Sequence, residues 1–169
     1  MTYDESLDIE EEDGNVDNTF LTFHVEGEEY AVPVGCVTEI VRLQKTFAVP
    51  DVPDYIRGVI NLRGKVIPLL DVRCRFRLTQ APYTDRTVVV VLEVGDSPMG
   101  LIVDGVSEVA EIAQDQIELR SGVPSRTQGR SFVKGMGKRE HGVSFILDVP
   151  ALLDVDRGPA GAVTDAAAS

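Results

Sequence analysis

Short apolar segments separated by glycine-containing turns run through most of the chain. Four such turns are predicted, at Glu26-Gly27, Arg63-Gly64, Gly95-Asp96 and His141-Gly142, and each lies between two apolar runs. Aromatic residues make up only 6% of the chain, so Val, Ile and Leu must supply most of the core. Because β-branched residues favour strands, the pattern predicts a mostly β protein built from many short strands.

Three segments between the strands carry helical signals. Residues 34–43 have apolar side chains at positions 34, 37, 40 and 41, a spacing that predicts a short helix. Residues 113–119 predict another helical turn. Residues 150–155 predict a terminal helix with Pro150 in its first turn.

The strand pattern occurs twice. Residues 55–72 (YIRGVINLRGKVIPLLDV) align without a gap with residues 132–149 (FVKGMGKREHGVSFILDV), at a constant offset of 77. Upstream, VTEI at 37–40 matches VSEV at 106–109, and a strand, a glycine turn and a second strand precede each. Two copies are too few for a solenoid. They predict two small β units related by a pseudo-two-fold axis, with a core shared along the seam between them.

Equivalent positions of the repeat give further expectations. Leu70 and Leu147 should be equivalent core residues. Asp71 and Asp148, which directly follow them, should cap the next helical turn.

The two copies differ at one charged position. Glu39 in the first copy matches Glu108 in the second, but Glu140 stands where the first copy has Arg63. We therefore expect an ion pair between Glu39 and Arg63, and none at the equivalent place in the second copy.

The net charge of −12 is unevenly distributed. Eight of the 28 acidic residues lie within residues 1–18, which contain no Lys or Arg. This composition is typical of a disordered tail. The rest of the chain carries 20 acids against 16 bases, which argues against nucleic-acid binding. No signal-peptide pattern and no apolar run of about 18 residues is present, so a cytoplasmic protein without direct membrane contact is expected.

Few residues suit catalysis or ligand binding. The two histidines, His24 and His141, have no Ser or Cys within two positions of them in sequence. The sequence GMGKRE at 135–140 lacks the spacing of a phosphate-binding loop. We therefore predict no catalytic residue, no metal site and no cofactor. The alternative is a small β-barrel module that binds a small molecule or a nucleotide through its basic hairpin turns.

Three segments carry a resemblance to a known family: GEEYAVPVGCVTEIV, YIRGVINLRGKVIPLLDVR and VVVVLEVGDSPMGLIVDGVSEV. In order and spacing, residues 20–153 resemble the chemotaxis coupling (CheW) family. The most specific part is Gly58, an apolar strand, the Asn-Leu-Arg-Gly hairpin at 61–64, Pro68 and Asp-Val-Arg at 71–73.

The resemblance implies two five-stranded SH3-like β-barrels related by pseudo-two-fold symmetry, with short helices. The resemblance covers a CheW-like domain at 19–155, with a subdomain boundary near 78–86. The acidic disordered tail expected at 1–18 is not part of the family's motif, and composition predicts a flexible tail at 156–169. The resemblance further implies a non-catalytic adaptor that couples the helical hairpin tip of a chemoreceptor to the regulatory domain of a histidine autokinase.

Site residues follow from the resemblance by position. The residues expected on the receptor side are Val37, Glu39, Gly58, Arg63, Val88, Gly100, Val106 and Val109. The kinase-side surface is expected on exposed apolar residues of the first barrel, namely Ile40, Leu43 and Leu62.

Overall fold

The computed structural model describes residues 18–119 and 132–153, which contain eleven β-strands and four short helices. The strands are β2 (Thr19–Val25), β3 (Glu28–Pro33), β4 (Val37–Arg42), β5 (Ile56–Leu62), β6 (Lys65–Asp71), β7 (Val88–Val94), β8 (Ser97–Val103), β9 (Gly105–Glu111), β10 (Ile117–Leu119), β11 (Val133–Arg139) and β12 (Gly142–Leu147). The helices are η2 (Val34–Cys36), α2 (Val72–Arg75), η3 (Gln114–Gln116) and α3 (Val149–Leu153). Of the tail predicted at residues 1–18, all but residue 18 lies outside the described residues, and so does the tail predicted at 156–169.

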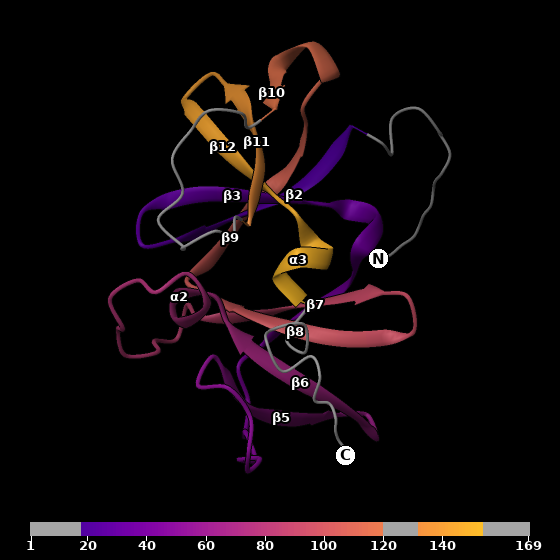
Figure 1. Ribbon diagram of the computed structural model, residues 1–169, viewed down its shortest axis with the longest axis vertical. Helices are drawn as coiled ribbons and strands as arrows, with labels where there is room; N and C mark the ends of the chain where they lie inside the picture. Colours follow the sequence, from indigo (N-terminus) through magenta and orange to yellow (C-terminus); the bar gives the residue numbers. More distant parts are fainter. Residues whose placement is uncertain (1–17, 120–131, 154–169) are drawn as a thin grey trace.

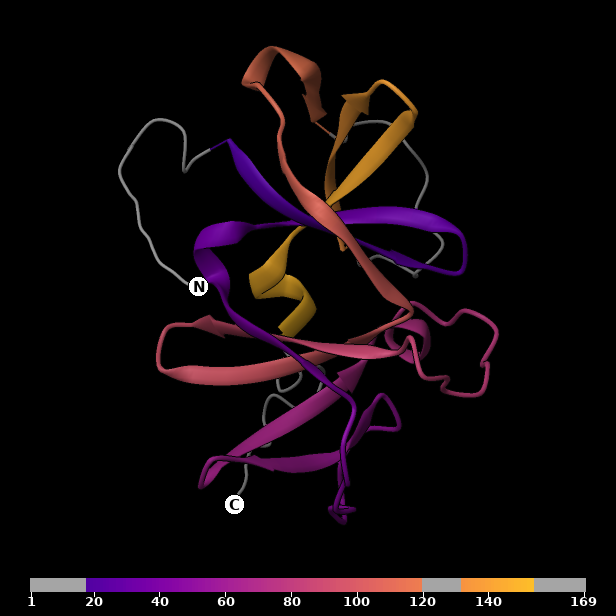
Figure 2. The same ribbon diagram turned by 180° about the vertical axis from the view of Figure 1, so that it is seen from behind.

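The strands form two sheets, which confirms the predicted fold class. The six-stranded sheet has the order β10-β11-β12-β3-β2-β9, and the five-stranded sheet has the order β4-β7-β8-β6-β5. Figures 1 and 2 show the two sheets one above the other, with α3 between them in both views.

The two copies of the repeat exchange hairpins. β2 and β3 of the first copy pair with β9 and β12 of the second copy, and β7 and β8 of the second pair with β4 and β6 of the first. The parallel pairs β3–β12 and β6–β8 join the copies in the same register. Ala31 lies opposite Ile146 in one pair, and at the equivalent positions Gly100 lies opposite Leu69 in the other. The second copy of the repeat begins after residues 78–86, but the sheets do not divide there.

Irregularities of the strands are repeated as well. The pairing of β4 skips Thr38 and that of β9 skips Ser107, two equivalent positions of VTEI and VSEV. Phe47 forms an isolated bridge with Val59 at the place where β10 pairs with β11 in the other sheet. In the five-stranded sheet, this single bridge therefore takes the place of the sixth strand. The bridge holds the segment after β4 against the edge strand β5.

The largest core lies along the seam, as predicted. It combines residues from both sheets, including Phe23 and Val32 on one side and Leu92 and Leu101 on the other. Smaller clusters fill the five-stranded sheet and the six-stranded sheet separately. Leu70 and Leu147 are both fully buried in the seam core, so the prediction that they are equivalent core residues is confirmed.

The helix predictions had mixed outcomes. The helix predicted at 34–43 is wrong: only Val34–Cys36 is helical, and Val37–Arg42 is strand β4, in which half-buried and exposed residues alternate. Its β-branched residues and its pairing with β7 favour the strand over the helical spacing of the apolar positions. The helical turn predicted at 113–119 is confirmed only for Gln114–Gln116, whereas the terminal helix is confirmed as α3.

The predicted caps are confirmed at both copies. The side chain of Asp71 accepts a hydrogen bond from the backbone N–H of Cys74, and that of Asp148 accepts one from Ala151. These bonds satisfy amide groups that the first turn of a helix leaves without an intrahelical partner.

Candidate docking surfaces

An exposed ion pair joins the two edges of the five-stranded sheet. Glu39 lies on β4, and Arg63 lies in the turn between β5 and β6, so the contact links the strands at opposite ends of the sheet order. The predicted pair is thereby confirmed. The side chain of Arg63 is 69% exposed and that of Glu39 is 31% exposed, which makes this a surface pair worth about 0–1 kcal/mol of folding free energy.

The turn that presents Arg63 is tight. Arg63 and Gly64 have φ angles of 54° and 85°, and the side chain of Asn61 accepts a hydrogen bond from the backbone N–H of Gly64 at 2.8 Å. Positive φ at both central residues is the geometry of a type I′ hairpin, which glycine and asparagine adopt more easily than arginine. The side chain of Arg63 is therefore held at the tip at a conformational cost of about 1–2 kcal/mol.

The second copy also has an ion pair, which the sequence comparison missed. Arg139, one residue before the position equivalent to Arg63, contacts Glu108 and also pairs with Glu29 at 2.8 Å. The expectation that no pair forms in the second copy is therefore wrong. The missed signal is the Arg next to Glu140 in KREHG: as the last residue of β11, Arg139 reaches Glu29 on β3 and Glu108 on β9.

The second pair is much less exposed than the first. The side chain of Arg139 is only 10% exposed, and His141 adds a contact of 3.1 Å between its Nε2 and Oε1 of Glu29. This cluster joins β11, β3 and β9 within the six-stranded sheet. Its main effect is therefore to stabilise that sheet, and it exposes little of the charge of Arg139.

The predicted receptor-side residues occupy different environments. Four lie on β4 and β9, which are the edge strands at corresponding places in the two sheets: Val37, Glu39, Val106 and Val109. The other four are Gly58 on β5, Arg63 in the hairpin turn, Val88 on β7 and Gly100 on β8. Val109 is 59% exposed, whereas the other three valines are half-buried and pack against the seam core.

Gly58 and Gly100 are buried, and neighbouring groups of the five-stranded sheet approach their backbone closely. A Cβ atom on Gly58, which has φ of +138°, would lie 2.4 Å from the backbone oxygen of Phe47. A Cβ atom on Gly100 would lie 2.6 Å from Val89 and 2.8 Å from Leu69. Their effect on any docking surface is therefore indirect, through the close approach of neighbouring groups.

The predicted kinase-side residues also differ in exposure. Ile40 is exposed and Leu43 is half-buried against the core of the five-stranded sheet. The expectation that Leu62 is exposed is wrong, since it is 9% exposed and points inward in the alternating pattern of β5. Phe47 and Val66 are exposed apolar residues of the same sheet that the sequence analysis did not select.

A polar cluster lies on one side of the seam. Arg73 of α2 donates from Nε and Nη2 to the two carboxylate oxygens of Asp104, at 3.1 Å and 2.7 Å. Burial raises the pKa of Asp104, but the hydrogen bonds from Arg73 and from the backbone N–H of Glu26 outweigh burial, so its pKa lies below the ordinary 3.8. We call Arg73, Asp104 and Glu26 the seam cluster.

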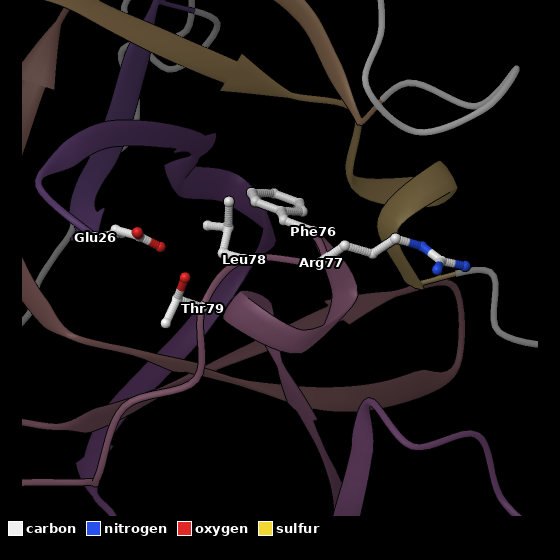
Figure 3. Close-up of a pocket in the computed structure, with 5 residues that line it drawn as sticks. All are labelled: Glu26, Phe76, Arg77, Leu78 and Thr79. Carbon is white, nitrogen blue, oxygen red and sulfur yellow. The ribbon is translucent and has the colours of Figure 1, made fainter.

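A hollow of about 330 Å³ lies next to the seam cluster. Glu26, Phe76, Arg77, Leu78 and Thr79 line it. Figure 3 shows that Arg77 extends away from the other four side chains, toward α3. Among residues 18–119 and 132–153, no group of three or more His, Cys, Asp or Glu side chains could hold a metal ion.

Comparisons with known proteins identify the family. The family model of the CheW-like domain matches residues 19–157. The chain is 33% identical over 138 residues to a chemotaxis protein CheW of Klebsiella aerogenes, with 82% of each chain covered. It is 37% identical over 135 residues to that of Bacillus subtilis, covering 79% of this chain and 85% of the relative. The chain therefore belongs to the CheW-like family.

A solved structure agrees with this assignment. The crystal structure of the scaffolding protein TtCheW from Thermoanaerobacter tengcongensis matches with a TM-score of 0.75 at 30% identity, covering 82% of this chain and 93% of that one. Separately, none of the helices within the described residues is long and apolar enough to cross a membrane.

Proposed function

We propose that this adaptor of the CheW-like family joins the helical hairpin tip of a chemoreceptor to the regulatory domain of a histidine kinase in the cytoplasm, without catalysing a reaction. The observation that carries the proposal is the family match over residues 19–157, which includes the Asn-Leu-Arg-Gly hairpin. The hairpin supports it further, because its turn holds Arg63 exposed against Glu39 in a backbone conformation that favours glycine.

The receptor-side surface in this proposal follows β4, β9 and the hairpin turn. Glu39, Arg63 and Val109 supply exposed contacts, and Val37, Val88 and Val106 supply half-buried apolar ones. Gly58 and Gly100 keep the underlying strands close. The kinase side uses Ile40 and Leu43, with Phe47 and Val66 as additional exposed apolar residues of the same sheet.

The test is binding of the full chain to a receptor cytoplasmic fragment and to a kinase regulatory domain, separately and together. We expect both binary complexes and a ternary complex, detected by calorimetry and by size-exclusion chromatography. Binding to neither partner would contradict the proposal. A nucleotide-induced rise in melting temperature would instead favour the small-molecule alternative, since a ligand at a hundredfold excess over Kd adds about 2.7 kcal/mol of stability.

Arg63→Ala tests the hairpin directly. We expect at least a tenfold weaker ternary complex, about 1.4 kcal/mol, because the exposed guanidinium is removed from the surface. Glu39→Ala should act in the same direction, and the double variant should be less than additive. Lys65→Ala is the matched control, since it removes a neighbouring exposed cation from the same hairpin and should change binding less than twofold. Unchanged binding by Arg63→Ala would remove the hairpin from the surface.

A further inference from the structure

Arg73 contacts three separate segments at the seam. Besides its bidentate pair with Asp104, it donates from Nη1 to the backbone oxygen of Thr79 at 2.7 Å, and Nη1 lies 3.6 Å from Oε1 of Glu26. Its side chain is only 17% exposed. A guanidinium held by this many partners in a partly buried position has a defined orientation.

The partners of Arg73 belong to different sheets. Arg73 follows β6 of the five-stranded sheet, and Glu26 is in the turn between β2 and β3 of the six-stranded sheet. Asp104 is the residue at which the chain passes from β8 in one sheet to β9 in the other. Its carboxylate also accepts a hydrogen bond from the backbone N–H of Glu26 at 2.8 Å. The seam cluster therefore ties both sheets to the crossing between them.

Helix α2 also contacts α3, which lies between the two sheets (Figure 1). Arg75 donates to the backbone oxygens of Leu152 and Ala151 in α3, and its guanidinium lies 4.2 Å from the ring of Tyr55 and 4.7 Å from that of Phe132. One four-residue helix thus contacts the turn at Glu26, the crossing at Asp104 and helix α3.

The second copy has no counterpart to these arginines. At the offset of 77, Pro150 and Leu152 of α3 stand in the places of Arg73 and Arg75. The pseudo-two-fold relation that holds for the strands is therefore broken at the helices. At these two positions, α2 has guanidinium groups and α3 has none. Since the duplicated strands form in the second copy without these arginines, Arg73 and Arg75 are candidates for a function other than forming the strands.

We propose that Arg73 is a positioning residue that fixes the relative orientation of the two sheets, and that this orientation sets how strongly the receptor-side and kinase-side partners favour each other's binding. The second half of this inference rests on the proposed function. The apolar seam core is stabilised by a non-directional effect, so it specifies the relative orientation of the two sheets less strictly than a directional contact does. The bidentate pair with Asp104 is directional, so it selects one orientation.

The first experiment measures orientation without any partner. Spin labels are placed on Val66→Cys and Val143→Cys, exposed and equivalent positions on the two sheets, in a Cys36→Ser/Cys74→Ser background. Electron–electron double resonance should give one narrow distance distribution for this parent. Arg73→Gln should broaden the distribution at least twofold or shift its maximum.

Arg57→Gln is the matched control. Arg57 contacts Asp71, Tyr83 and Gln80, so it holds the same connecting segment as Arg73, but within the described part of the chain its hydrogen bonds and ion pair stay among residues 54–83. We expect its distribution to equal that of the parent. An unchanged distribution in folded Arg73→Gln, or equal broadening in both variants, would overturn the proposal. If Arg73→Gln fails to fold, Asp104→Asn removes the same ion pair and must give the broadening.

The second experiment measures the coupling between partners. The Kd for the receptor fragment is determined with and without saturating kinase regulatory domain, and the ratio of the two values is the coupling factor. Arg73→Gln should change this factor at least fivefold while each binary Kd stays within twofold. A merely structural role would leave the ratio unchanged.

The outcomes separate the two proposals. An unchanged coupling factor, or tenfold weaker binary complexes, would overturn the role of Arg73 in coupling. If the parent chain binds neither partner, the proposed function fails and the coupling role fails with it. The distance measurement still decides whether Arg73 orients the sheets.

Discussion

The two copies of the repeat hold the same kind of ion pair in different surroundings. In the first copy, Glu39 and Arg63 meet at the surface across the two edges of a sheet. In the second, the glutamate equivalent to Glu39 meets Arg139, whose side chain is largely buried and also binds Glu29. The difference shows that a duplicated position can keep its contact while its role changes from a displayed charge to an internal brace.

The comparison extends to the hairpins. Each sheet takes two strands from one copy and the rest from the other, so neither copy contains a complete sheet. The copies are thus alike in sequence pattern but depend on each other for folding. We expect the largest effects from changes that separate the copies, and the smallest from changes at single exposed charges.

Cutting the chain between the copies should have the largest effect. Residues 18–80 alone lack the strands β7 and β8 that pair with β4 and β6, and residues 87–153 lack β2 and β3. Each half leaves strand edges and half of the seam core exposed, so we expect no cooperative thermal transition from either monomer. Mixing the two halves should restore it, as measured by circular dichroism. A stable monomeric half would show that the copies fold independently.

Leu70→Ala and Leu147→Ala should have large and similar effects. Both side chains are fully buried in the seam core, and truncation leaves a cavity there. We expect each to lower the free energy of unfolding by about 2–5 kcal/mol. Urea denaturation of both variants gives the comparison. A cost below about 1 kcal/mol at one position only would mean that the copies do not contribute equally to the seam.

Arg139→Ala should destabilise the protein more than Arg63→Ala. Truncating Arg139 leaves Glu29, whose side chain is 14% exposed, with one contact fewer, at a cost of roughly 1–3 kcal/mol. Truncating the exposed Arg63 should cost less than about 1 kcal/mol. Equilibrium denaturation of the two variants at the same pH decides the order. The reverse order would contradict the assignment of brace and displayed charge.

Much of the fold was predictable because each copy of the repeat is marked by short local patterns in the sequence. The turns, the paired Leu and Asp positions and the shared seam core all follow from short patterns of apolar residues and glycine. The helix expected at 34–43 failed because apolar spacing was read without the pairing partner β7, which lies about 50 residues further along the chain. Periodicity in a short segment cannot distinguish a strand with a bulge from a helical turn.

The contacts that position the candidate surfaces were less predictable. The alignment places Glu140 in the position of Arg63 and so predicts no ion pair with Glu108, but Arg139 forms one. A side chain at the end of a strand is placed by the register of its sheet and not by the repeat offset. The exchange of hairpins was likewise invisible, because the order of elements along the chain is the same with or without it. The role of Arg73 depends on turns 47 and 31 positions away in sequence.

The smallest expected effect concerns the pH dependence of the seam cluster, in which Arg73 and Glu26 of the first copy meet Asp104 of the second. The pKa of Asp104 in the folded chain lies below its ordinary value of 3.8, because hydrogen bonds from Arg73 and Glu26 outweigh the effect of burial. A lowered pKa of the folded state means that the ion pair stabilises the protein above pH 3.8 and that this contribution is lost as the pH falls through the folded value.

Asp104→Asn should therefore be less stable than the parent, by about 1 kcal/mol at pH 7 and at pH 5. The gap should close as the pH falls below 3.8. Asp96→Asn, in the exposed turn between β7 and β8, is the control and should leave stability unchanged. Urea midpoints of the three proteins across this range measure the gap, and a difference that persists undiminished in acid would show that Asp104 acts through packing and not through its charge.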